Sequence, residues 1–188
     1  MQRSPLSGFL TNSLLLTGNK VKLRPKRLVD AINDYQWRRD DQLCRLDATR
    51  PTGCSFEEYL KLTAETPYNF GRSCHLAIEN MDGKHIGNCS YFNVDDVARE
   101  AEIGIMIGDK SYWDQGYGAD ALITVLNYIF TQTNLKRVYL KTLQWNIRAQ
   151  NCFKKCGFTP CGLLSREGYN FLLMEIHRPS QQPDQSSK

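Results

Sequence analysis

Residues 101–122 read AEIGIMIGDKSYWDQGYGADAL, and they predict a strand, a turn with two glycines and the start of a helix. The run 101–108 is apolar apart from one glutamate, which is typical of a strand buried in a sheet. After Gly118, apolar residues recur at the spacing of a helix face, at Leu122, Val125, Leu126, Ile129 and Phe130. We therefore expect a strand–turn–helix unit whose turn covers 109–117.

Gly116 and Gly118 lie where this helix begins. The first N–H groups of a helix have no partner within the helix and carry the positive end of its dipole. Because glycine leaves such groups open, a phosphate fits directly on the backbone of this turn. The turn lacks the Gly-Lys-Ser/Thr of a Walker A loop, and Ala121 replaces the third glycine of a Rossmann loop. From the residues alone, a tight turn that packs closely on a strand remains the alternative.

The rest of the chain predicts further strands and helices around this unit. Ser55 and Glu58 form a capping box at a helix start, and Asp82–Gly83 predicts a hairpin turn. Gly157 is expected to end the last helix. Strands are expected over 20–24, 74–79, 84–93, 101–108, 137–142, 159–165 and 169–177, and helices over 29–37, 55–66, from 118 onward and around 149–156. This is an α/β (α+β) pattern, which predicts one domain over 1–178 and a disordered tail over 179–188.

Composition excludes several classes of function. The 188 residues carry a formal net charge of only +4, so the basic cluster at 20–27 is interpreted as a solvated strand edge rather than a nucleic-acid surface. The seven cysteines show neither CxxC nor zinc-finger spacing, which predicts reduced thiols and no metal site. The sequence has no signal-peptide pattern and no membrane-spanning run. We expect a cytoplasmic protein that binds neither nucleic acid nor membrane.

Several linked motifs point to a family. They are LRP near the start, AEIGIMIG, W-x-x-G-Y-G and the run NIRAQNCFKKCGF. Together they resemble the GNAT superfamily of acyl-CoA-dependent N-acetyltransferases from about Val21 to Ile176, and most closely the branch of ribosomal-protein N-terminal and polyamine acetyltransferases. The resemblance implies the GNAT fold, a twisted, mixed and mostly antiparallel sheet of about six to seven strands with about four helices.

The resemblance also implies where acetyl-CoA binds. The family's glycine-turn pattern falls on Trp113, Gln115, Gly116, Tyr117, Gly118 and Ala119, with the pyrophosphate on the N–H groups of 115–119. The pantetheine arm is expected along Met106, Ile107 and Gly108, which requires the strand to part from its neighbour there. Asn146 and Asn151 are expected to contact the cofactor. From the residues alone, Asn146 is equally a helix N-cap, and Asn151 a solvated helix residue.

Glu102 is the candidate general base. An amine must lose a proton before it attacks a thioester, and Glu102 is the only charged residue in the run 101–108. Apolar surroundings raise the pKa of a carboxyl group toward neutrality, as a base requires. The alternative is a structural glutamate that pairs with a nearby arginine. Phe153 stands where many relatives carry a tyrosine acid, so Tyr117 and Tyr169 are weaker substitutes, and Lys141 stands where some N-terminal acetyltransferases carry a glutamate.

The resemblance implies an acetyl-CoA-dependent N-acetyltransferase that needs no metal and acts as a monomer or homodimer. Its acceptor is a protein or peptide N-terminus, a polyamine or another small amine. Negative charge in the acceptor groove is expected from four acidic residues, Asp34, Asp40, Asp41 and Asp47, which alternate with arginines. The alternative is a CoA-binding sensor or interaction module that has kept the fold without turnover.

Overall fold

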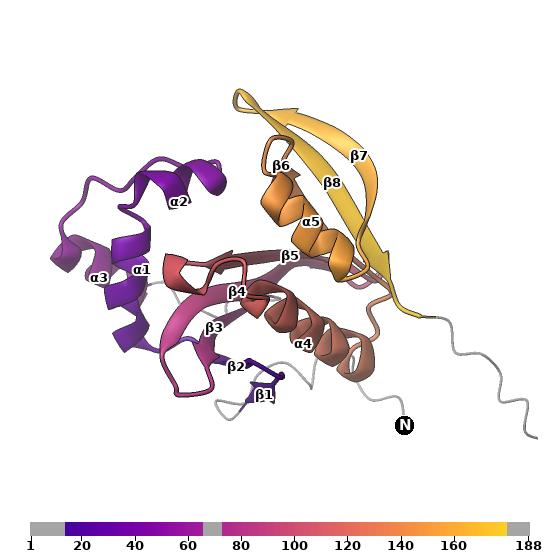
Figure 1. Cartoon of the computed structure of the whole chain (residues 1–188), viewed down its shortest axis with the longest axis horizontal. Coiled ribbons are helices and arrows are strands. Elements are labelled where there is room, and N and C mark those ends of the chain that lie inside the picture. Colours follow the sequence, from indigo (N-terminus) through magenta and orange to yellow (C-terminus); the bar gives the residue numbers. More distant parts are fainter. Residues whose placement is uncertain (1–13, 66–72, 180–188) are drawn as a thin grey trace, which may run out of the picture.

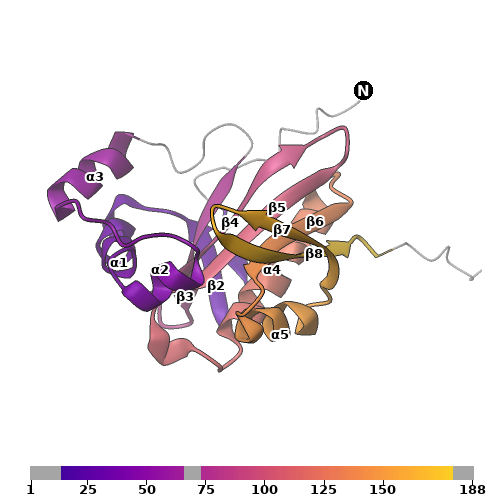
Figure 2. The ribbon, with the colours of Figure 1, turned by 90° about the horizontal axis from the view of Figure 1, so that it is seen from above.

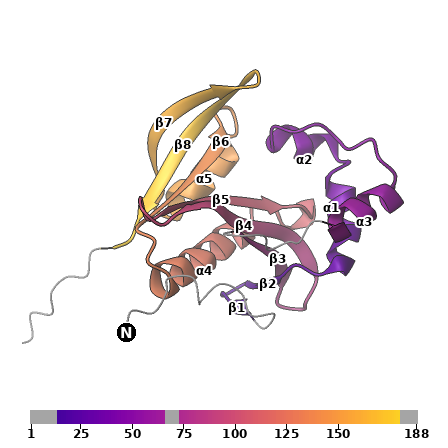
Figure 3. The ribbon, with the colours of Figure 1, turned by 180° about the vertical axis from the view of Figure 1, so that it is seen from behind.

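The computed structural model describes residues 14–65 and 73–179. Its elements are β1 (Leu16–Thr17), β2 (Val21–Pro25), the short 3-10 turn η1 (Leu28–Asp30), α1 (Ala31–Trp37), α2 (Asp41–Leu46), α3 (Phe56–Glu65), β3 (Cys74–Asn80), β4 (His85–Asp95), β5 (Glu100–Ile107), the 3-10 turn η2 (Lys110–Tyr112), α4 (Tyr117–Gln132), β6 (Arg137–Leu143), α5 (Ile147–Lys155), β7 (Thr159–Arg166) and β8 (Tyr169–His177). Figures 1 and 3 place α1–α3 at the opposite end of the molecule from the β7–β8 hairpin. The predicted helix end at Thr66 and the tail beyond Pro179 lie outside the described residues.

The strands form one mixed sheet in the order β1-β2-β3-β4-β5-β6-β8-β7. Strands β1 to β5 pair antiparallel in chain order, β5 pairs parallel with β6, and β6, β8 and β7 are again antiparallel. The predicted sheet type is correct. The expected count of six to seven strands and four helices was too low, because the two-residue β1 and the helix α2 were not predicted.

Strands β5 and β6 separate after a short paired segment. Their register covers only 100–102 against 137–139, whereas β5 stays paired with β4 as far as Ile107. Strand β6 continues instead with β8, up to the pair of Leu143 with Phe171. The sheet is therefore open between the second half of β5 and the second half of β6, as expected for the strand that receives the pantetheine arm.

Helix α4 covers one face of the sheet. Its predicted stripe is buried at Leu122, Val125, Leu126 and Ile129, and it packs on β1, β2, β5 and α5. Figure 2 shows α4 and α5 next to each other below the sheet. The Asp120 carboxylate, in the first turn of α4, accepts the backbone N–H groups of Asn19, Lys20 and Val21. The start of α4 is thus tied to the turn before β2.

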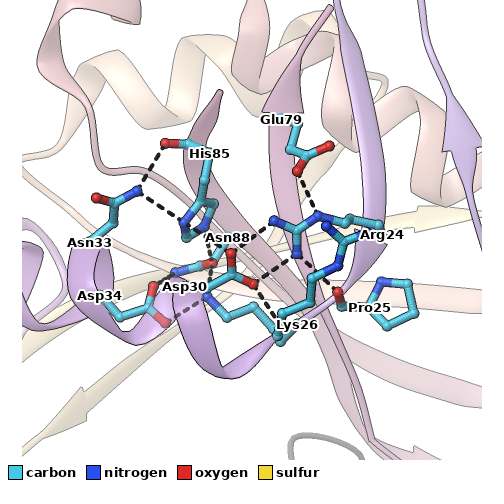
Figure 4. A network of polar contacts seen from close by, with 10 residues as sticks. Arg24, Pro25, Lys26, Asp30, Asn33, Asp34, Glu79, His85 and Asn88 are labelled. Atoms are coloured by element: carbon cyan, nitrogen blue, oxygen red, sulfur yellow. Dashed lines mark hydrogen bonds and ion pairs between the residues drawn. The ribbon is translucent and has the colours of Figure 1, made fainter. Parts of the chain in front are cut away.

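On the other side of β2, a buried polar network holds α1 beside the sheet (Figure 4). Arg24 donates to both oxygens of Asp30 (2.8 Å each) and to Glu79 (2.6 Å). Lys26 donates to Asp34 and to Asn88 (2.6 Å each). The interpretation of the basic cluster as a solvated edge was wrong for Arg24 and Lys26, because β2 is an interior strand and Arg24 is only 6% exposed. Lys20 and Arg27, at the two ends of the cluster, are exposed.

The pair of Arg24 and Asp30 gives a stability prediction. Asp30→Asn leaves the buried guanidinium without its bidentate anion, and we expect the free energy of unfolding in urea to fall by about 3 kcal/mol. Burial alone would raise the pKa of Asp30, but the Arg24 guanidinium and the Arg27 N–H hold it below its ordinary 3.8. The stabilisation is therefore present above about pH 4 and is lost as the pH falls through the lowered pKa.

The matched control is Glu57→Gln. Glu57 pairs with Lys61 at 2.9 Å on the surface of α3, and loss of such an exposed pair costs at most about 0.5 kcal/mol. Equal, small losses in the two variants would contradict the role assigned to the buried network.

Candidate functional site

A cavity of about 430 Å³ opens at the point where β5 and β6 separate. Its lining comes from α2, β5, the turn before α4, the first turn of α4, and α5: Leu43, Leu46, Asp47, Ile105, Met106, Ile107, Tyr112, Trp113, Asp114, Gly116, Tyr117, Gly118, Ala119, Asn146, Arg148, Ala149, Asn151, Cys152, Phe153 and Lys155. All the predicted cofactor residues are among them except Gly108 and Gln115. The glycine turn and the strand edge thus belong to one site.

The glycine turn presents bare backbone to this cavity. Gly116 is the N-cap of α4 in the left-handed conformation (φ 85°), and a Cβ built there would meet nothing within 4 Å. A Cβ on Gly118 would lie 3.6 Å from Ile107 Cγ1 and 3.8 Å from Cys152 Sγ, so it would project among residues of the lining. Within the described residues, the N–H groups of 115–119 donate to no protein acceptor. This is the arrangement that an anion requires.

The open edge of β5 is formed by the backbone of Ile105 and Ile107, so only Ile107 of the three predicted residues contributes to it. The Gly108 N–H donates to the Ile86 carbonyl (2.9 Å), toward β4, and Trp113 Nε1 donates to the Ile107 carbonyl (2.7 Å) on the opposite side. Along an antiparallel strand, the backbone groups of successive residues point toward opposite neighbours. The N–H and C=O groups of Ile105 and the N–H group of Ile107 therefore face the opening, whereas both backbone groups of Met106 face β4.

Gly108 has a packing role that the sequence did not indicate. A Cβ there would meet the Trp37 ring at 2.1 Å, so the absence of a side chain lets Trp37 of α1 lie on the end of β5. The prediction of Gly108 as a pantetheine contact is therefore wrong for its N–H group. Met106 contributes its side chain to the cavity lining.

Two predicted asparagines line the cavity from α5. Asn146 is the N-cap of α5, and its side-chain oxygen accepts the Ala149 N–H (3.2 Å), so the capping alternative is correct. Its amide still borders the cavity, and so does the exposed Asn151. Gln115 faces elsewhere: its side chain donates to the Ser111 carbonyl, and its own carbonyl accepts Lys20 Nζ (2.9 Å).

Basic side chains at the cavity were not predicted. Arg148 stacks on the ring of Trp113, with its guanidinium carbon 3.6 Å from the ring centroid, and Lys155 lies two helical turns further along α5. Both positive charges border the same cavity as the open N–H groups of the turn. They suit the phosphate groups of a nucleotide-type cofactor.

The acidic groove predicted for the acceptor is largely absent. Asp34 is buried and accepts hydrogen bonds from Lys26 and Asn88. Asp40 caps α2 and pairs with Lys110 at 2.6 Å. Of the four predicted aspartates, only Asp47 lines the cavity, 3.5 Å from Arg38. The pairing of Asp40 could not be recognised because Lys110 lies on a distant element.

Glu102 is not in the cavity lining; it lies on the face of β5 turned away from α4, four residues before Met106, which is in the lining. Its side chain is 6% exposed, and its two oxygens are 2.9 Å from Lys141 Nζ and 3.0 Å from Asn93 Nδ2. Glu102 thus forms a salt bridge, as the structural alternative predicted, but its partner is a lysine and not the predicted arginine. Gly104 lies between Glu102 and Met106 on this face, so no side chain of β5 separates Glu102 from the cavity.

Phe153, at the position where a tyrosine acid would be expected, is buried in the lining and has no proton to give. Tyr117 lines the glycine-turn end of the cavity, and its ring packs edge-on against Tyr112. Tyr169 begins β8 at the hairpin tip and does not line the cavity.

Neither a metal-binding cluster nor a membrane-spanning helix is found in the described part of the chain. In the ranges 14–65 and 73–179, no three His, Cys, Asp or Glu side chains lie close enough together to hold a metal ion. No helix of the described part is long and apolar enough to span a membrane. The seven cysteines, all within the described ranges, are free thiols.

Comparison with known proteins gives one family. The acetyltransferase (GNAT) domain family matches residues 20–159. An uncharacterized N-acetyltransferase p20 of Bacillus licheniformis is 30% identical over 79 residues, which cover 42% of this chain and 44% of that protein. The spermidine N(1)-acetyltransferase of Vibrio cholerae is 28% identical over 92 residues, 49% of this chain and 53% of that protein. The chain thus matches about half the length of these curated relatives.

The fold has close structural counterparts. The crystal structure of the Vibrio cholerae spermidine N-acetyltransferase in complex with CoA and spermine has a TM-score of 0.75 to this chain at 21% identity. The superposition covers 84% of this chain and 95% of that one. At 21% identity, the similarity between the two chains is a similarity of fold.

Proposed function

This chain belongs to the acetyltransferase (GNAT) family, and on that premise we propose that it transfers the acetyl group of acetyl-CoA to a primary amine. One observation carries the proposal: the gap between β5 and β6 opens into a cavity that ends on the unpaired N–H groups of the glycine turn. A long cofactor with a thioester at one end and phosphates at the other fits such a site.

Each part of the site has a role toward acetyl-CoA. The N–H groups of 115–119 hold the pyrophosphate, and Arg148 and Lys155 add positive charge. The backbone edge at Ile105 pairs with the amide groups of the pantetheine arm and supplies an N–H for the oxygen of the thioester, where negative charge develops. Trp113 ends this open edge at Ile107, because its indole N–H donates a hydrogen bond to the Ile107 carbonyl, which faces the opening.

Glu102 acts as the general base. It accepts a proton from the acceptor ammonium, and the free amine attacks the carbonyl carbon of the thioester. The C–S bond then breaks, and the second proton of the attached nitrogen passes through water to the leaving CoA thiolate, since Phe153 has none to give. Asn93 holds the second carboxylate oxygen in place (3.0 Å). For Glu102 to act, Lys141 must leave the first oxygen.

We propose a small polyamine-like amine as the first acceptor class and a peptide N-terminus as the second. The relatives named for spermidine acetylation support the first class. Asp47, at the α2 side of the cavity, is the carboxylate placed to attract a second ammonium group of such a substrate.

The experiment is an acceptor screen with acetyl-CoA. Thiol release and product mass are followed with spermidine, spermine, other primary amines and short peptides with free N-termini. Release of thiol together with an acetylated amine supports the proposal. Cofactor binding without turnover on any amine would favour the CoA-binding module instead.

A further inference from the structure

Lys141 occupies the place on Glu102 that an acceptor amine would take. Its Nζ is 2.9 Å from Glu102 Oε1, and its side chain is 31% exposed. On β6, Val138 and Leu140 lie in the core, and alternation puts Lys141 on the opposite face together with Tyr139. That is the face on which Glu102 lies.

The register of the two strands shows how far this lysine reaches. Glu102 pairs with Tyr139 in parallel register, so Lys141, two residues later, is level with Gly104 across the gap. Strand residues rise by about 3.3 Å each, so Glu102 and Met106 lie about 7 Å behind and ahead of that level. The Lys141 ammonium group already reaches back to Glu102 (2.9 Å). To meet a thioester near Met106, the side chain turns the other way along the strand, past Gly104. Gly104 itself has no side chain, and Phe92 Cε1 and Ser90 Oγ border the space over it, 3.5 and 3.6 Å from a built Cβ.

We propose that Lys141 is a site of self-acetylation: with no acceptor present, its Nζ receives the acetyl group from acetyl-CoA bound in the same molecule. This rests on the proposed acetyl transfer with Glu102 as the base. Glu102 takes one proton from the Lys141 ammonium, and the free amine attacks the thioester carbon. An N–C bond forms and the C–S bond breaks. The second proton of the attached nitrogen passes through water to the leaving CoA thiolate, which gives acetyl-lysine and CoA.

The modification changes the site. Acetyl-lysine is neutral, so the ion pair with Glu102 is lost, and the added acetyl group fills space where an acceptor amine has to bind. An acceptor that takes Glu102 first displaces Lys141 and protects it. Self-acetylation is therefore expected to decline as acceptor is added and to slow later turnover once it has occurred.

The test uses the full chain with acetyl-CoA that carries an isotope label in the acetyl group, without acceptor. Peptide mapping by mass spectrometry should place one label on Lys141, at a rate per molecule that does not depend on protein concentration. Lys61 is the internal control, because its side chain is 68% exposed on α3 and it is outside the cavity lining. Chemical acetylation without catalysis would label Lys61 at least as strongly.

Two variants sharpen the test. Lys141→Arg keeps a cation beside Glu102 and removes the nucleophile, so the label should disappear from that peptide and should not move elsewhere. Glu102→Gln should slow labelling of Lys141 by about 10² to 10⁴, the usual contribution of a positioned base. Label spread over several lysines, or a rate unchanged in Glu102→Gln, would overturn the proposal.

A parallel reaction with spermidine tests self-acetylation and the proposed function separately. If thiol release and acetyl-spermidine are observed while Lys141 stays unlabelled, self-acetylation is refuted and the proposed function stands. If neither spermidine nor Lys141 is acetylated, self-acetylation is refuted, and the acceptor screen decides on the proposed function.

Discussion

Replacement of Glu102 by Gln is expected to lower the turnover of acetyl-CoA with an amine by about 10² to 10⁴ and to leave acetyl-CoA affinity nearly unchanged. The reason is that the carboxylate lies on the acceptor side of β5, outside the lining of the cofactor cavity. The pH–rate profile should lose its acidic limb. Activity should partly recover at high pH, where the amine is already free. Steady-state kinetics over a range of pH, with cofactor affinity measured separately, give the result.

Glu100→Gln is the matched control. Glu100 lies on the same strand and is also ion-paired, with Arg137 at 2.6 Å, but it is further from the opening of the sheet. Its variant should keep its turnover and pH profile. If both variants lose activity in proportion to lost stability, Glu102 has a structural role and the base is another group.

Gly116→Ala is expected to weaken acetyl-CoA binding by tenfold or more, equal to about 1.4 kcal/mol or more. A Cβ at this position enters the open space above the N–H groups, where the pyrophosphate has to lie. The left-handed conformation (φ 85°) also disfavours any residue with a Cβ, by roughly 1 to 2 kcal/mol of stability. Binding is measured by calorimetry and by the rise in melting temperature that acetyl-CoA produces.

The chain contains a close control for the backbone strain. Gly83, in the β3–β4 turn, has φ 83° and also has nothing within 4 Å of a built Cβ. Gly83→Ala should therefore lower the melting temperature by a similar amount and leave acetyl-CoA binding intact. Equal loss of binding in the two variants, or in neither, would refute the glycine turn as the phosphate site.

The elements around the glycine turn could be predicted because their signals are local. The apolar spacing of α4, the capping box of Ser55 and Glu58 and the terminal Gly157 depend on neighbours in the chain. All three are present: Glu58 accepts the Ser55 N–H at 2.7 Å, Gly157 has φ 93°, and the stripe of α4 is buried. The motifs also contain most of the residues that line the cavity. A backbone site beside a glycine pair can be placed from the sequence because it does not depend on distant side chains.

What could not be predicted depends on partners distant in sequence. The pairs of Glu102 with Lys141, of Arg24 with Glu79, and of Trp113 with Arg148 form only when strands and helices meet. The basic cluster of β2 was taken for a solvated edge because β1, which covers that side, has only two residues and so no periodic pattern. Helix α2 has only six residues, too few for a clear periodic pattern.

The most direct test of the account is a crystal structure of the protein with CoA. The account predicts that pyrophosphate oxygens accept hydrogen bonds from N–H groups of residues 115–119, and that the pantetheine arm lies along Ile105 in the gap between β5 and β6. The sulfur atom should end near Met106, on the side of Glu102. CoA bound elsewhere on the molecule, or bound with its phosphates away from Gly116 and Gly118, would contradict the account.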